Sequence, residues 1–251
     1  MSGKWIDVAS LAFLICFLFS QQSFAQTNSQ LWSDFIMTWQ KTTRLSYELD
    51  LQAKALVSAP ENEPDWKSLD ITQTFEYSAK NWMDLSGEFV TGYTKQTDDV
   101  NSFELTPRVG VRFHLFSNRI NPLLKEKHPK RRLVIRDLIR VEYRSFFYNN
   151  DDSDFSWRSR NRVEFLFPLN HPKLTDDATV YIISDWEWFI PISDVQERFA
   201  NKQRIRVGIG YRQSFKWQFE ALYIWTRSRK NLDEHFTTSD NIIDLRVKYR
   251  F

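Results

Sequence analysis

The sequence alternates apolar and polar residues over most of its length, and this pattern constrains the fold more than any other feature. In the last segment, residues 241–251, Ile243 and Leu245 fall on one face while Asp244 and Arg246 fall on the other. Successive side chains of a β-strand point to opposite faces, so a period of two indicates a strand. Ten segments show the pattern strongly: 44–56, 69–77, 82–93, 103–116, 131–147, 157–167, 179–190, 204–212, 217–225 and 241–251. A weaker segment at 34–39 precedes them.

The first residues, 1–25, have the layout of a cleaved secretory signal peptide. Lys4 precedes the apolar run LAFLICFLFS, which is too short to span a bilayer, and SFAQ provides small residues for cleavage after Ala25. An uncleaved membrane anchor is the alternative. Cys16 is the only cysteine and lies in this run, so the mature chain would contain no disulfide. We expect residues 26–251 to form a single domain.

Alternation alone is compatible with a soluble sandwich or with a membrane barrel. Four features favour the barrel. The strands are about ten residues or longer, as tilted transmembrane strands must be. Charged residues continue through the middle of the polar faces, Trp and Tyr gather near strand ends, and the last strand ends in Phe251. We therefore predict an all-β fold, a closed antiparallel transmembrane β-barrel.

The strand count and the ends of the chain follow from the rules of bacterial barrels, which normally have an even number of strands and both termini in the periplasm. We predict ten strands, with residues 34–39 folded into the mouth or the lumen. Twelve strands is the alternative. Pro107 lies in the middle of a strand pattern and cannot donate to a ladder, so it indicates a bulge or a strand that begins after it.

The signal peptide, the amphipathic strands and the terminal VKYRF resemble those of bacterial outer-membrane β-barrels. This resemblance implies that the last strand, with Tyr249 and Phe251, is an assembly signal for the barrel-assembly machinery. More narrowly, the chain from LWSDFIMTWQKTTRLSYELDLQAKALVSA onwards is similar to a family known only as domain of unknown function 2490. The resemblance implies a location in the cell outer membrane of a Gram-negative bacterium and contact with its lipid, but no activity.

If the apolar faces point outward, the polar faces line a lumen. Its acidic candidates come from the early strands: Glu48, Asp50, Glu76 and Glu88. Its candidates for binding small anions come mostly from the later strands: Arg108, Arg112, Arg136, Arg140, Arg144, Arg158, Arg160, Arg162, Arg204, Arg206, Arg212, Arg246 and Lys248. Asp137 is an exception, because it falls on an apolar face.

These candidates lead to two readings of the lumen. A wall dense in arginine would lower the barrier for small anionic solutes. Alternatively, Arg and Glu on neighbouring strands neutralise each other and plug the barrel, because about ten strands is close to the size at which side chains fill the interior. We therefore expect a narrow, porin-like pore or a structural barrel.

Two other classes of function remain open on the sequence. One is an outer-membrane enzyme acting on lipid or peptide at the extracellular rim, where His235 lies near Ser239 and Asp240. The other is a surface interaction barrel that uses acidic loops containing Asp98 and Asp151. No catalytic motif, zinc spacing or phosphate loop is present, so we expect no enzyme, cofactor or metal. The net charge of +2 argues against a nucleic-acid partner.

Overall fold

A computed structural model describes residues 27–59, 65–97, 100–115, 132–150, 152–192, 201–229 and 235–251. The expected signal peptide and the acidic loop residues Asp98 and Asp151 lie outside these ranges. Over the described ranges, no helix is long and apolar enough to cross a membrane.

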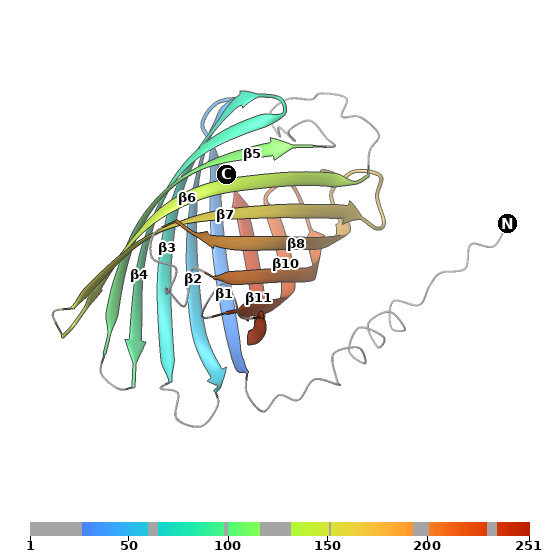
Figure 1. The fold of residues 1–251 in the computed structure, drawn as a ribbon. Coiled ribbons are helices and arrows are strands. Elements are labelled where there is room, and N and C mark those ends of the chain that lie inside the picture. The colour runs from blue at the N-terminus through green and yellow to red at the C-terminus, as the bar shows by residue number, and fades with distance from the viewer. Residues whose placement is uncertain are drawn as a thin grey trace.

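The described residues form eleven strands that close into one barrel (Figure 1). Each strand pairs antiparallel with the next along the chain, and β1 closes the ring by pairing parallel with β11. The strands are β1 (Asn28–Gln40), β2 (Leu45–Ser58), β3 (Trp66–Lys80), β4 (Met83–Gln96), β5 (Ser102–His114), β6 (Val134–Tyr148), β7 (Ser153–Pro168), β8 (Thr179–Pro191), β9 (Lys202–Arg212), β10 (Trp217–Ser228) and β11 (Thr237–Arg250).

The closed all-β barrel is confirmed, but the prediction of ten purely antiparallel strands was wrong. Residues 34–39 do not fold into the mouth or the lumen; they form the middle of β1. A chain that reverses direction at every turn brings its first and eleventh strands into the ring in the same direction. The described part of the chain therefore begins and finishes at opposite ends of the barrel, and the expectation that both ends of the barrel domain lie on one side was also wrong. We call these ends the Asn28 end and the Phe251 end.

The seam between β1 and β11 is supported by an ion pair inside the barrel and by a backbone hydrogen bond at its end. Inside the barrel, Arg246 Nε of β11 lies 3.0 Å from Asp34 Oδ2 of β1. At the Phe251 end, the backbone N–H of Phe251 donates to the carbonyl of Thr38 at 3.0 Å. Parallel pairing is slightly less stable per residue than antiparallel pairing. These contacts therefore strengthen the one parallel pair of the described ring.

An aromatic chain crosses the same seam on the outer face at the Phe251 end. Each of its rings contacts the next: Phe75, Tyr47, Trp39, Phe251, Tyr249 and Trp217. The ring of Phe251 stacks on that of Trp39 with 4.6 Å between centroids and an interplanar angle of 8°. The terminal aromatic residue thus joins the last strand to the first, which gives the final Phe a structural role in closure.

We expect Phe251→Ala to lower the free energy of unfolding by about 1 kcal/mol, because it removes stacked and edge-on ring contacts at the seam. The measurement is the midpoint temperature at which the fast-migrating folded form disappears from unboiled gels. Phe89→Ala is the matched control, since Phe89 lies on the outer face without a ring partner among the described residues. Equal midpoints for the two variants would contradict a role for the ring chain in closure.

Pro107 neither starts a strand nor forms a bulge, so that prediction was wrong. β5 continues through Pro107, and pairing with β6 is interrupted between Leu105 and Arg108 without a change of register. The missing N–H of proline accounts for the gap in the ladder.

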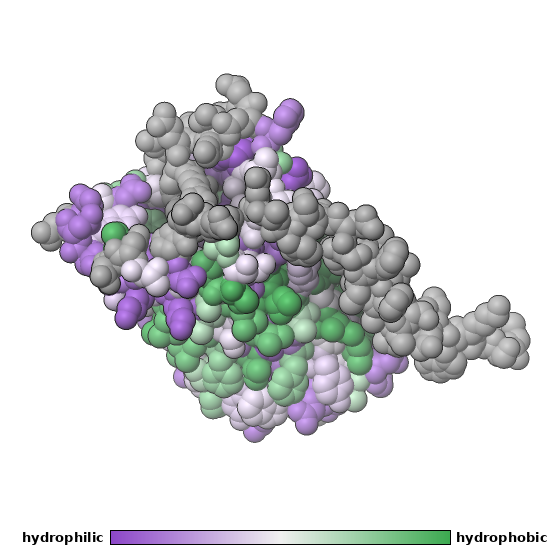
Figure 2. Space-filling model, turned by 90° about the horizontal axis from the view of Figure 1, so that it is seen from below, coloured by the Kyte–Doolittle hydropathy of each residue, from purple (hydrophilic) through white to green (hydrophobic). Residues whose placement is uncertain are grey.

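The outer surface of the barrel is strongly apolar. Large side chains remain exposed along the strands; Leu69 is 52% exposed, Val109 66% and Ile190 53%. Figure 2 shows a broad apolar area on one face, with hydrophilic residues on either side of it. Asp137 also lies outside the cavity, where its Oδ1 accepts a hydrogen bond from Asn161 Nδ2 at 2.7 Å. The outer face thus exposes large apolar side chains over much of its area.

The interior contains apolar clusters as well as charges. One cluster, on β6 to β10, consists of Val134, Leu166, Tyr181, Ile183 and Leu222. The other crosses the seam and consists of Trp32, Ile224 and Ile242. The Tyr181 ring passes over Gly210, where an added Cβ would lie 2.0 Å from ring carbon Cζ, so this position requires glycine. The lumen is therefore partly filled.

Candidate functional site: the interior cavity

One cavity of about 950 Å³ occupies the interior of the barrel. Its lining includes β1 residues from Asn28 to Gln40, so it extends along the whole of that strand. All the proposed acidic residues line it: Glu48, Asp50, Glu76 and Glu88. So do all the proposed basic residues: Arg108, Arg112, Arg136, Arg140, Arg144, Arg158, Arg160, Arg162, Arg204, Arg206, Arg212, Arg246 and Lys248.

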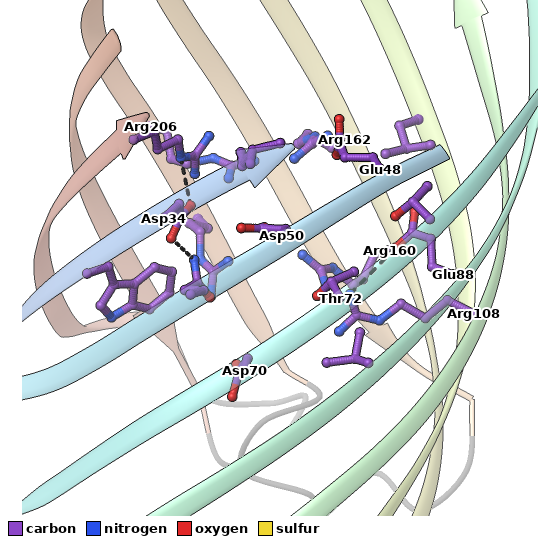
Figure 3. Close-up of a pocket in the computed structure, with 18 of the residues that line it drawn as sticks. Asp34, Glu48, Asp50, Asp70, Thr72, Glu88, Arg108, Arg160, Arg162 and Arg206 are labelled. Carbon is purple, nitrogen blue, oxygen red and sulfur yellow. Dashed lines mark hydrogen bonds and ion pairs between the residues drawn. The ribbon is translucent and has the colours of Figure 1, made fainter. Parts of the chain in front are cut away.

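Acidic side chains predominate on one wall of the cavity and arginines on another, with Lys54, Glu104 and Glu164 as exceptions. β2 to β4 contribute the acidic wall, which consists of Glu48, Asp50, Asp70, Glu76 and Glu88. β5 to β9 contribute the arginine wall, which consists of Arg108, Arg140, Arg160, Arg162, Arg204 and Arg206. Figure 3 shows members of both walls projecting into the same space. Strands that follow one another in the chain are neighbours in the ring. The early strands, which are rich in acids, and the later strands, which are rich in arginine, therefore line different sides of the lumen.

A fully buried carboxylate, Glu142, holds part of the arginine wall together. Its oxygens lie 2.6 Å from Arg158 Nε, 2.8 Å from Arg160 Nη1 and 3.3 Å from Arg108 Nε. The side chain of Glu142 is 0% exposed. Three guanidinium groups so close together would repel one another, and the buried acid offsets that repulsion.

A second buried carboxylate, Glu187, does the same from β8. Arg160 Nη2 lies 2.7 Å from its Oε1 and Arg140 Nη2 lies 3.4 Å from the same atom, while Arg204 Nη1 lies 3.5 Å from Oε2. The Phe189 ring on the same strand lies within 5.1 Å of the Arg160 and Arg204 guanidinium carbons. Cation–π contact and ion pairing therefore fix the guanidinium positions together.

Some acids of the acidic wall reach cations on other strands. Glu88 Oε2 lies 2.9 Å from Arg140 Nη1 and 3.6 Å from Arg108 Nη1. Glu76 pairs with Arg112, two strands away. These pairs narrow the cavity, and they neutralise much of the positive charge that the sequence suggested for the lumen.

Asp50 and Arg162 differ from the charges around them. Over the described part of the chain, neither side chain forms an ion pair or a hydrogen bond, and Asp50 Oδ1 and Arg162 Nε are both shielded from solvent. Both side chains line the cavity. They are an acidic and a basic side chain of the cavity that no described residue contacts through an ion pair or a hydrogen bond.

The family described as "Protein of unknown function (DUF2490)" matches residues 29–236. The chain belongs to this family. The match begins within β1 and ends just before β11, so the family's pattern covers β1 to β10 of the DUF2490 barrel and leaves out the last strand. No curated protein and no solved structure matches the chain.

A polar triplet that sequence reasoning did not connect lies at the Phe251 end of the DUF2490 barrel. Ser78 Oγ donates to Asp84 Oδ1 at 2.6 Å, and His114 Nε2 lies 2.7 Å from Asp84 Oδ2. The carboxylate stands between the hydroxyl and the imidazole, which is not the order of a nucleophile activated by a base. The triplet joins β3, β4 and β5. No pattern within any one strand shows that these three residues meet.

The residues that suggested rim catalysis do not form a base–hydroxyl pair in this DUF2490 chain. Ser239 Oγ donates to Asp240 Oδ2 at 2.8 Å, whereas His235 is exposed and has no hydrogen bond to Ser239. Within the described ranges, no group of three His, Cys, Asp or Glu side chains is placed to hold a metal ion. The interior cavity is therefore the candidate functional site.

Proposed function

We propose that this protein is an outer-membrane barrel that provides a narrow, water-filled passage for small polar solutes. The observation that carries the proposal is the cavity lined along the full length of β1, from the Asn28 end to the Phe251 end. A lining that reaches both ends of a closed barrel supports a route through it. The charged walls suit polar solutes, which lose hydration on entering a narrow space.

The outer-membrane location rests on the outer surface and on the closed ring. Large apolar side chains exposed in this number are unfavourable in water. Lipid hydrocarbon is the environment that suits them on a barrel with a polar interior. Closure satisfies the backbone groups that an open sheet would leave unpaired in lipid. The signal-peptide pattern of residues 1–25 is consistent with export.

The ion pairs support a passage with weak charge selectivity rather than a strong preference for anions. Glu142 on β6 and Glu187 on β8 neutralise part of the arginine wall from among its own strands, and Glu88 does so from the adjacent β4. The apolar clusters and these bridges also limit the width. An eleven-stranded barrel of this kind lies nearer the filled eight-stranded size than the open porins.

We expect purified folded protein to produce small, discrete conductance steps in planar bilayers, with a reversal potential near zero across a KCl gradient. Liposomes containing it should swell in glycine but not in a trisaccharide, because the ion-paired walls admit only small solutes. Heat-denatured protein is the control. A folded barrel that gives neither conductance nor swelling would support the structural role instead, and protein that stays monodisperse without detergent would contradict the membrane location.

A further inference from the structure

An acidic and a basic side chain, each without a contacting partner among the described residues, line the cavity from opposite sides of the ring. Asp50 belongs to β2 and Arg162 to β7, and these strands lie half-way round the closed ring from one another. In Figure 3 both side chains are seen in the interior, from strands on different sides of the cavity. No contact joins them, so the space between them belongs to the cavity.

The neighbours of Asp50 explain why it is free. It is paired in register with Ile36 on β1 and with Thr72 on β3, and neither can supply a positive charge. Most other members of the acidic wall have a cation: Asp70 pairs with Lys54, Glu76 with Arg112 and Glu88 with Arg140. The carboxyl group of Asp50 therefore lines the cavity without a contacting cation among the described residues.

The neighbours of Arg162 have the same effect on the other side. In register it faces Leu138 on β6 and Glu187 on β8. Glu187 is already contacted by Arg140, Arg160 and Arg204, which leaves Arg162 without its carboxylate. The guanidinium is thus available to an anionic group from within the cavity, and its planar fork suits a carboxylate.

The charged form of a partly buried acid or base is unfavourable without a contacting counter-charge, and a ligand that supplies the opposite charge stabilises it. A solute with one charge relieves only one of the two sites. A solute with an ammonium at one end and an anionic group at the other relieves both and adds no net charge to the cavity. We infer that the cavity binds small zwitterions, with the cationic group at Asp50 and the anionic group at Arg162. This inference rests on the proposed passage, because the solute must enter from one mouth.

The test is a binding measurement by calorimetry on folded protein in detergent, so that it does not depend on conduction. The probes are glycine, γ-aminobutyrate and ε-aminocaproate, which separate the two charges by increasing lengths. Butyrate and butylamine are the single-charge controls. We expect at least one of the amino acids to bind on the order of 10-fold more tightly than either control, because it forms two charge-assisted contacts instead of one.

Asp50→Asn and Arg162→Gln should each weaken binding of the preferred zwitterion. The affinity should fall to that of a single-charge control. Asp137→Asn is the matched substitution outside the cavity, and Asn161 can still donate a hydrogen bond to the new side chain. This variant should bind the zwitterion as tightly as the unmodified protein. The folded form of each variant is checked by its mobility on unboiled gels. If either cavity variant fails to fold, the comparison between zwitterion and single-charge probes on the unmodified protein still decides the matter.

Equal affinity for the zwitterions and for butyrate or butylamine would overturn the inference, as would full binding by both cavity variants. Failure of the passage is a separate result: zwitterion binding by a barrel that is silent in bilayers would support the binding site and overturn the conducting role. Conduction without zwitterion preference would overturn the binding site alone.

Discussion

Phe35→Pro is expected to abolish the folded barrel, whereas Phe35→Ala should leave it folded. Phe35 lies in the middle of β1, paired with Val247 of β11 on one side and with Leu51 of β2 on the other. Proline removes a ladder donor and is poorly tolerated inside a sheet, at a cost of about 3 kcal/mol or more by analogy with helices. The damage is larger here, because opening the seam exposes the edges of two strands at once.

The measurement compares boiled with unboiled protein on gels, together with resistance of the unboiled protein to trypsin. Phe35→Ala removes the same side chain but keeps the backbone donor, so it isolates the effect of the ladder. Deletion of residues 28–40 should match Phe35→Pro. A deletion protein that still gave a compact, protease-resistant barrel would mean that the remaining ten strands close without β1, as the sequence suggested.

Most strands could be predicted because the alternation repeats, whereas β1 could not be placed. In residues 34–39 the apolar residues fall on both faces, with Ile36 inward and Phe35 and Met37 outward. The period of two is therefore hidden. The inward neighbour Trp32 packs with Ile224 and Ile242, and only the closed ring brings these residues together.

The direction of each polar side chain could also be predicted, but its partners could not. Arg160 and Arg162 lie on one face of β7, two positions apart, and the sequence gives no reason to distinguish them. In the barrel Arg160 contacts both Glu142 and Glu187, while Arg162 contacts neither. Which acid reaches which arginine depends on register and on side chains two strands away, and alternation carries no such information.

Glu142→Gln is expected to lower the free energy of unfolding by about 3–5 kcal/mol, because it leaves a cluster of buried guanidinium groups without their shared anion. Arg108, Arg158 and Arg160 would then face one another in a setting where Glu142 itself is fully buried. The midpoint of urea unfolding, followed by tryptophan fluorescence in detergent, measures the change. Glutamine keeps the volume of the side chain, so a packing defect is not the cause.

Glu164→Gln is the matched control, since Glu164 pairs with Arg136 at 3.2 Å and its side chain is 18% exposed. Its loss should cost less than that of Glu142, because one contacting guanidinium rather than three is left without its anion. Adding Arg158→Gln to Glu142→Gln should recover part of the stability, because one of the repelling charges is removed. If Glu142→Gln were no more harmful than Glu164→Gln, solvent ions rather than the buried acid would be neutralising the arginine wall. In that case the passage would favour anions, and the reversal potential of the unmodified protein would shift accordingly.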